Sequence, residues 1–193
     1  MLTVQLLLEI IGAGLTLASV LTAVREHRAT WLFAGGSAVL YAFVYWRAGL
    51  PVSAEVQLVY LVSSVYGWLH WGDATGRLRP RSGSLRLRLV TPAVTLGLAA
   101  ALYRLNGGAT AGVAAGYDAL LVAAALTAQL LMTRKYISCW WYWLVVNLGY
   151  LPLLYGQQLW VTLAVYLVLL PQTVRGARDW YARRTVPSAT ALP

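Results

Sequence analysis

The sequence is poor in the residues on which several protein classes depend. Among its 193 residues there is one cysteine, Cys139, and there are two histidines, His27 and His70, far apart along the chain. A single cysteine excludes an internal disulfide, and two separated histidines exclude the clustered ligands of a membrane metalloprotease. The one lysine, Lys135, lies between apolar segments, whereas a retinal receptor needs a lysine inside one. We therefore expect no metal, no cofactor and no enzymatic activity.

Charged residues are also scarce. They make up 11% of the chain while apolar residues make up 60%, against about 25% and 45–50% in soluble domains. This composition predicts an all-α membrane protein, because a bilayer offers the backbone no hydrogen bonds and a span of about 20 apolar residues must fold as a helix. Seven such spans are predicted, at residues 2–24, 30–46, 51–71, 85–103, 109–133, 136–155 and 158–174.

The charges that are present are mainly basic, with a net charge of +9. They gather at the ends of the spans and form no stripe along a helix, which favours a membrane orientation over a nucleic-acid surface. Two of the fifteen basic residues, Arg47 and Arg104, fall on the same side as the N-terminus. The other thirteen fall on the opposite side: Arg25, Arg28, Arg77, Arg79, Arg81, Arg86, Arg88, Arg134, Lys135, Arg175, Arg178, Arg183 and Arg184.

The positive-inside rule then places the N-terminus outside and the C-terminus in the cytoplasm, in a bacterial inner membrane crossed several times. The first span is expected to stay in the protein as a helix, because no basic leader and no small-residue cleavage site accompany it.

The chain also repeats itself at an offset of 109 residues. Matching pairs are Arg25 and Arg134, Trp31 and Trp140, Tyr41 and Tyr150, Gly67 and Gly176, and Trp71 and Trp180, and the acid Glu9 falls opposite the acid Asp118. This offset spans four helices, so the two copies are predicted to be parallel. We expect a first three-helix bundle (1–76), a basic loop with a linker helix (77–106), a second bundle (107–181) and a cytoplasmic tail (182–193). Parallel repeats occur in small transporters whose substrate lies between the copies.

Polar and aromatic side chains recur at helical spacing on three spans. Trp140, Trp143, Asn147 and Tyr150 lie on one face of the sixth span. Because lipid leaves an amide unbonded, the amides should face a ligand or a neighbouring helix. Aromatic faces with a few amides suit a flat heteroaromatic molecule that carries hydroxyls, such as a vitamin or nucleoside. The candidate substrate-binding residues are Gln57, Tyr60, Trp68, Trp140, Trp143, Asn147, Tyr150 and Tyr166.

Other intramembrane and boundary residues have competing interpretations. Asn147 could instead bond a neighbouring helix. Glu9 and Asp118 lie inside their spans, where an acid can take part in gating or relay protons, or can bond a neighbour in the same way in both copies. Tryptophans near span ends typically form an interfacial belt, which is the expectation for Trp31, Trp46, Trp160 and Trp180.

Two stretches resemble a known family. The run Leu131-Met-Thr-Arg-Lys-Tyr136, followed by Trp140, Trp143 and Asn147, is similar to the second half of PnuC-type nicotinamide riboside transporters. In the first half, Gln57 followed by Tyr66-Gly67-Trp68 and Trp71 is similar too, and the resemblance covers nearly the whole chain.

The resemblance implies a SWEET-like fold of seven helices in a 3+1+3 arrangement. It implies facilitated diffusion of a vitamin nucleoside that supplies NAD biosynthesis, with ligand contacts at Gln57, Trp143 and Asn147. Ser37 stands where family members often carry asparagine, and Pro51 where they carry tyrosine.

Relatives with the same fold carry thiamine, riboflavin or nucleosides, so these substrates stay open beside nicotinamide riboside. A receptor or complex subunit that binds without translocating is the alternative from another class. The expected partners are a small-molecule substrate and the lipid bilayer, with no nucleic acid, and a homo-oligomer is left open.

Overall fold

The computed structural model describes residues 2–47, 51–71, 79–108, 112–156 and 160–184. Within these ranges the chain forms seven α-helices and no strand, which confirms the predicted all-α fold. Six helices begin and end close to the predicted spans, whereas α7 continues well past the predicted end at residue 174. The helices are α1 (Leu2–Val24), α2 (Ala29–Arg47), α3 (Pro51–Trp71), α4 (Leu85–Leu105), α5 (Gly112–Thr133), α6 (Cys139–Gly156) and α7 (Trp160–Ala182).

The last two turns of α7 were not expected from hydropathy, because charged residues interrupt the apolar run there. Asp179 pairs with Arg175 at 3.8 Å and with Arg183 at 3.5 Å, both one turn away along the helix. Exposed pairs of this kind contribute only about 0.3–0.5 kcal/mol each. The stronger contribution comes from Trp180, whose side chain is completely buried. The charges therefore end the apolar segment without ending the helix.

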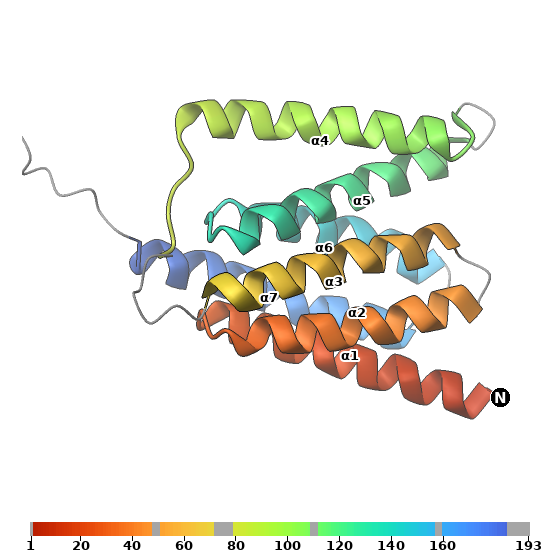
Figure 1. Ribbon diagram of the computed structural model, residues 1–193. Helices are drawn as coiled ribbons and strands as arrows, with labels where there is room; N and C mark the ends of the chain where they lie inside the picture. The colour runs from red at the N-terminus through yellow and green to blue at the C-terminus, as the bar shows by residue number, and fades with distance from the viewer. Residues whose placement is uncertain (1, 48–50, 72–78, 109–111, 157–159, 185–193) are drawn as a thin grey trace, which may run out of the picture.

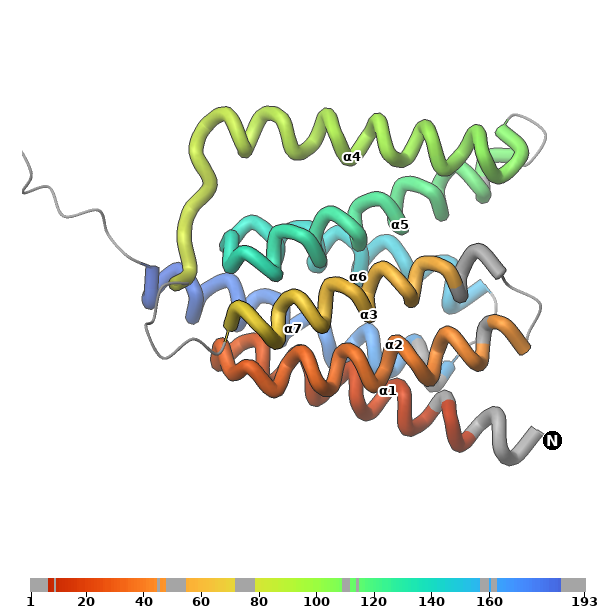
Figure 2. The backbone as a smooth tube through the Cα atoms, in the orientation of Figure 1, coloured from red at the N-terminus to blue at the C-terminus, as the bar shows by residue number. Residues whose placement is uncertain are grey.

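Six of the helices form a closed ring. Along the ring the contacting pairs are α1 with α2, α2 with α3, α3 with α5, α5 with α6, α6 with α7, and α7 with α1, while α4 lies outside the ring against α5 (Figure 2). In Figure 1, α1 and α5 both run from right to left, as do α3 and α7, whereas α2 and α6 run back. The second half thus repeats the first in the same direction, which confirms the parallel 3+1+3 arrangement.

The outer surface of the ring is apolar. On α3, Leu58, Val62, Val65 and Leu69 are all more than half exposed and lie on one helix face. Contiguous exposed apolar surface of this extent marks contact with lipid or with another protein. By length and composition, the helical segments Leu85–Leu105 and Ala115–Thr133 could each cross a membrane, and Ile10–Val24 and Ala29–Val44 are shorter apolar helices, among the residues that the structure describes.

Small polar side chains join neighbouring helices inside this apolar assembly. Gln129 of α5 donates through Nε2 to Ser63 Oγ of α3 at 2.8 Å, across the boundary between the two halves. Ser37 of α2 lies 2.7 Å from the hydroxyl of Thr16 and donates to the carbonyl of Gly12 at 3.0 Å, both on α1. Hydrogen bonds of this kind stabilise helix pairs in lipid. Ser37 is therefore bonded to α1.

Candidate functional site

Five of the predicted substrate-binding residues lie on the helical segments of α3, α6 and α7 and are called here the aromatic site: Tyr60, Trp143, Asn147, Tyr150 and Tyr166. Tyr60 of α3 and Trp143 and Tyr150 of α6 pack against the same small buried cluster on α5 and α6. The Tyr150 ring meets that of Tyr166 on α7 edge to face, with centroids 5.8 Å apart. Asn147 is 5% exposed and lies one turn of α6 from Trp143.

Five buried polar side-chain atoms have no hydrogen-bond partner among the described residues. One belongs to the aromatic site, the indole Nε1 of Trp143, and the others are Oε1 of Gln172 on α7, Nε of Arg28, and the indole Nε1 of Trp31 and of Trp140. Buried polar atoms are nearly always bonded, so each exception calls for a water or a ligand. Gln172 was not selected from the sequence, and its position directly after Pro171 inside the helix is the signal that could have drawn attention to it.

The structure gives the other predicted residues different surroundings. Gln57 is half-buried on α3. Trp68 is also half-buried, and the guanidinium of Arg28 lies 3.8 Å from the centroid of its ring. Trp140 is 1% exposed and belongs, with Trp68 packed against it, to a second cluster at one end of the ring. The predicted positions thus do not form a single site, although Trp143 packs against both clusters.

One of the two intramembrane acids can be placed. Asp118 is exposed on α5, and its Oδ1 accepts a hydrogen bond of 3.4 Å from the hydroxyl of Tyr150. This contact puts a carboxylate at the edge of the aromatic site, where it could meet a ligand or a proton. The side chain of Glu9 lies outside the described residues.

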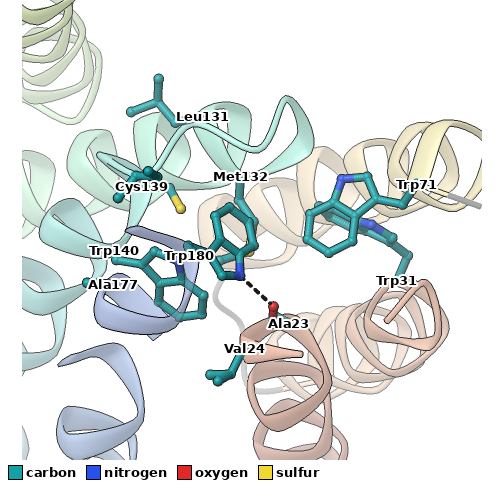
Figure 3. Packing of buried hydrophobic residues seen from close by; sticks show 11 residues of the cluster. Ala23, Val24, Trp31, Trp71, Leu131, Met132, Cys139, Trp140, Ala177 and Trp180 are labelled. Carbon is teal, nitrogen blue, oxygen red and sulfur yellow. Dashed lines mark hydrogen bonds between the residues drawn. The ribbon is translucent and has the colours of Figure 1, made fainter. Parts of the chain in front are cut away.

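A second group, called here the tryptophan cluster, lies where α1, α3, α5 and α7 end and α2 and α6 begin. It consists of Trp31 and Trp71 from the first half and Trp140 and Trp180 from the second (Figure 3). Trp31 meets Trp71 at 5.0 Å and 88°, and Trp140 meets Trp180 at 5.3 Å and 87°. A third contact, of 5.7 Å between Trp71 and Trp180, joins the two pairs.

This cluster corrects the interfacial-belt prediction for two residues. Trp31 and Trp180 are 2% and 0% exposed, so neither faces lipid, whereas Trp46 and Trp160 are more than half exposed. The prediction was wrong because distance from a span end does not tell which face of the helix a side chain occupies. Burial of both edges of an indole needs neighbours from several helices, which only the ring supplies.

Two tryptophans of the cluster bond the opposite half. The Nε1 of Trp71 donates to the carbonyl of Thr133 at the end of α5, and that of Trp180 donates to the carbonyl of Ala23 at the end of α1, both at 3.0 Å. The last carbonyls of a helix have no partner within it. The third helix of each half therefore donates to a carbonyl at the end of the first helix of the other half, and these two bonds join the halves at this end. Figure 3 shows the bond from Trp180 to Ala23.

The turns after α1 and α5 are alike and hold an ion pair. His27 N–H donates to Thr22 O, and Tyr136 N–H donates to Leu131 O, both at 3.0 Å, and the intervening Glu26 and Lys135 have φ of 58° and 54°. Both turns are thus helix C-caps of the kind that normally carry glycine. A left-handed residue with a side chain costs roughly 1–2 kcal/mol.

Across the two turns, Lys135 Nζ lies 3.1 Å from Glu26 Oε2. The sequence analysis missed this pair. The available signal was two opposite charges separated by the repeat offset of 109 residues.

Gly176→Ala tests the packing of the tryptophan cluster. A Cβ at Gly176 would come 2.5 Å from Cζ2 of Trp140, and overpacking of this kind typically costs 1–3 kcal/mol, so we expect a loss of about that size. The matched control is Gly97→Ala on α4, where a Cβ meets nothing within 4 Å. It should be neutral or stabilising by up to about 1 kcal/mol, because alanine favours a helix over glycine. Thermal unfolding in detergent measures both, and equal effects would contradict the packing.

Other features are less suited to a polar ligand. A shallow apolar groove between α1 and α7 is lined by Leu17, Trp160, Ala164, Val165 and Val168, and none of these belongs to the aromatic site. Among the described residues, no group of three or more His, Cys, Asp or Glu side chains could hold a metal ion. The aromatic site is therefore the strongest candidate for binding a small polar molecule.

Comparison with known proteins identifies similar chains. A protein-family model described as nicotinamide mononucleotide transporter matches residues 6–182. The nicotinamide riboside transporter PnuC of Escherichia coli (strain K12) is 20% identical over 204 residues, which cover 90% of this chain and 84% of that protein. The riboflavin/roseoflavin transporter RibM of Streptomyces davaonensis is 24% identical over 194 residues, covering 95% of this chain and 89% of that protein.

A solved structure has the same fold. The crystal structure of the vitamin B3 transporter PnuC superposes with a TM-score of 0.74 and covers 91% of this chain and 80% of that chain, at 22% sequence identity. The ring of six helices with a seventh outside it is thus an arrangement already observed in an experimental structure.

Proposed function

Because the chain belongs to the nicotinamide mononucleotide transporter family, matched over residues 6–182, we propose that it carries nicotinamide riboside across the membrane by facilitated diffusion. The family resemblance predicted from the sequence is confirmed, and the chain is a membrane transporter of the vitamin and nucleoside class. The substrate, the energetics and the residues that bind it are the parts proposed here.

The observation that carries the proposal is a difference between the two regions of the ring. The tryptophan cluster obeys the repeat, because Trp31 corresponds to Trp140 and Trp71 to Trp180. The aromatic site obeys it only at Tyr150, which corresponds to Tyr41. At the offset of 109 residues, Trp143 corresponds to Ala34, Asn147 to Ala38, and Tyr60 to Leu169.

This difference favours a substrate without two-fold symmetry. Two identical halves would offer identical groups to both sides of a ligand. A nucleoside has a flat base at one end and a ribose at the other, so it needs an aromatic surface in one place and hydrogen-bonding groups in another. We assign base stacking to Trp143 and the tyrosines, and polar contacts to Asn147 and Gln57. The positive charge of a pyridinium ring would add cation–π attraction.

The repeat also supports a mechanism of alternating access. The two bundles, residues 1–76 and 107–181, would rock against each other around the aromatic site, as in other carriers built from repeats. The linker residues 77–106 would join them outside the ring. No nucleotide-binding P-loop pattern occurs in the sequence, so the proposed movement is driven by the substrate gradient.

The orientation follows from the basic residues. We propose that the end of the ring that holds the tryptophan cluster faces the cytoplasm of a bacterial cell, because Arg25, Arg28 and Arg134 lie in the turns at this end. The N-terminus would then lie outside and residues 182–193 inside.

Counterflow in liposomes tests the function. Purified protein is reconstituted into liposomes loaded with unlabelled nicotinamide riboside, and labelled nicotinamide riboside is added outside without ATP or an ion gradient. We expect rapid accumulation of label, which empty liposomes do not show. Riboflavin, thiamine and nicotinamide mononucleotide serve as competitors. Competition by riboflavin alone would favour the alternative substrate suggested by RibM. Binding without accumulation would refute a carrier in favour of a receptor.

A further inference from the structure

The ion pair between Glu26 and Lys135 lies on the boundary between the two bundles. The two residues are 109 positions apart, so they occupy equivalent turns, Glu26 after α1 and Lys135 after α5. Two equivalent residues that touch each other must lie close to the axis that relates the halves. Their contact therefore closes the end of the ring at its centre and not along one side.

The pair is protected from solvent and lies next to the tryptophan cluster. The side chain of Lys135 is 6% exposed and that of Glu26 16%. Lys135 Nζ also lies 4.9 Å from the ring centroid of Trp71, which itself contacts Trp180 of the other half. The ion pair and the Trp71–Trp180 contact thus form two adjoining layers, and each layer takes one residue from each bundle.

The backbone at both positions gives independent support. Glu26 and Lys135 are the only described residues other than glycine with positive φ, and glycine would fit both caps with less strain. Strained residues tend to mark functional positions when the surrounding structure holds them in place. Here the two strained positions carry opposite charges. If the two halves were identical in sequence, these equivalent positions would carry the same charge and would repel each other.

Among the described residues, Glu26 is the only one of the first bundle whose side chain forms an ion pair with residues of the second half. Its Oε2 pairs with Lys135, and its Oε1 lies 3.2 Å from Nη1 of Arg183 at the end of α7. Arg183 also reaches the carbonyl of Val24 at 3.3 Å and Asp179 at 3.5 Å. One carboxylate of the first bundle therefore binds two cations, Lys135 of the second bundle and Arg183, which directly follows α7.

We propose that Glu26 and Lys135, backed by Trp71 and Trp180, form the inner gate of the transport path, which is closed in this structure. The inference rests on the proposed function for the path that the gate closes, but the gate itself is a contact between bundles that can be tested without a substrate. For the path to open at this end, Glu26 must leave Lys135 and Arg183 as the bundles part.

Distance measurements between spin labels test the gate. Arg25 and Arg134 are exposed, equivalent in the repeat and adjacent to the gate residues, so labels on Arg25→Cys and Arg134→Cys report the separation of the bundles. The one native cysteine, Cys139, is removed by Cys139→Ala. In this background, pulsed electron paramagnetic resonance without substrate should give a short, narrow distance distribution.

Loss of the gate should lengthen the distance in a defined order. Glu26→Gln should shift the distribution furthest, because it breaks two contacts, and Lys135→Met should shift it less. Glu26→Gly removes the charge and also relieves the strain of the left-handed cap. This variant should therefore fold at least as well as the wild type and should still lengthen the distance between the two spin labels. Glu55→Gln makes the same chemical change at an exposed position at the opposite end of α3 and should change nothing.

Unchanged distances in both Glu26→Gln and Glu26→Gly would overturn the gate. The two proposals can fail separately. If the distances lengthen but the liposomes accumulate none of the tested solutes, the result supports the gate and contradicts the proposed function.

Discussion

Trp180→Ala is expected to lower the free energy of unfolding by about 3–5 kcal/mol, as for other buried large aromatic residues replaced by alanine. The indole is completely buried and donates a hydrogen bond to the carbonyl of Ala23. Its removal leaves a cavity between the two halves, and the carbonyl of Ala23 keeps only the hydrogen bond from the backbone N–H of Glu26. In lipid the loss comes mainly from van der Waals contacts, because helices there have no hydrophobic driving force to associate.

Trp160→Ala is the matched control for this prediction. Trp160 begins α7 and is 54% exposed, and its ring meets that of Tyr155 edge to face at 5.5 Å, so the same change of side chain removes fewer protein contacts than at Trp180. We expect it to lower the free energy of unfolding by at most about 1.5 kcal/mol, the contribution of one aromatic pair. Thermal unfolding of both variants in the same detergent, followed by size-exclusion chromatography, measures the difference. Similar losses for Trp160→Ala and Trp180→Ala would contradict the closed tryptophan cluster.

Trp180→Phe separates packing from hydrogen bonding at this position. Phenylalanine keeps part of the aromatic volume but cannot donate to Ala23. The free energy of unfolding of Trp180→Phe should therefore fall between those of the wild type and Trp180→Ala. About 1 kcal/mol of its loss should be due to the hydrogen bond.

Asn147→Ala and Trp143→Ala are expected to weaken the binding of nicotinamide riboside while the protein still folds. A lost hydrogen bond in a buried site costs about 1–3 kcal/mol, which is roughly 5- to 150-fold in affinity. For Trp143→Ala we expect a similar loss, because replacing an aromatic residue that stacks on a base by alanine costs about 1–3 kcal/mol per base in proteins that bind single-stranded nucleic acids. Equilibrium binding of labelled nicotinamide riboside to detergent-solubilised protein measures both variants.

Trp141→Ala controls for the loss of a tryptophan from α6. Trp141 is 59% exposed on another face of the same helix, two residues before Trp143. We expect Trp141→Ala to bind with wild-type affinity. Wild-type affinity in both Trp143→Ala and Asn147→Ala would refute the assigned site. An equal loss in Trp141→Ala would instead point to a general disturbance of α6.

The tryptophan cluster and the aromatic site differ in how closely they follow the repeat. The tryptophan cluster is built from residues that both halves share, as we expect of a contact that closes and parts symmetrically. Most residues of the aromatic site are not shared, for example Trp143, which corresponds to Ala34, as we expect of a site for a nucleoside, whose two ends differ in chemistry. Glu26 and Lys135 combine both features, since their backbones are equivalent and their charges are opposite.

The number of helices, the parallel repeat and, except for α7, the approximate helix ends could be predicted from the sequence alone. This was possible because a bilayer forces each apolar segment of sufficient length into a helix, so that composition along the chain is enough. The helical spacing of Trp143, Asn147 and Tyr150 on one face could be read in the same way, since a regular helix fixes which residues share a face.

Which helix faces meet could not be predicted from the sequence. Trp31 and Trp180 lie at span ends, as lipid-facing tryptophans do, yet the ring buries both. The bond from Trp180 to Ala23 joins residues 157 positions apart, and the ion pair joins residues 109 apart. Hydropathy and periodicity describe each helix alone, whereas these contacts depend on how six helices close around one axis. That closure depends on the packing of side chains from different helices, which no single segment encodes.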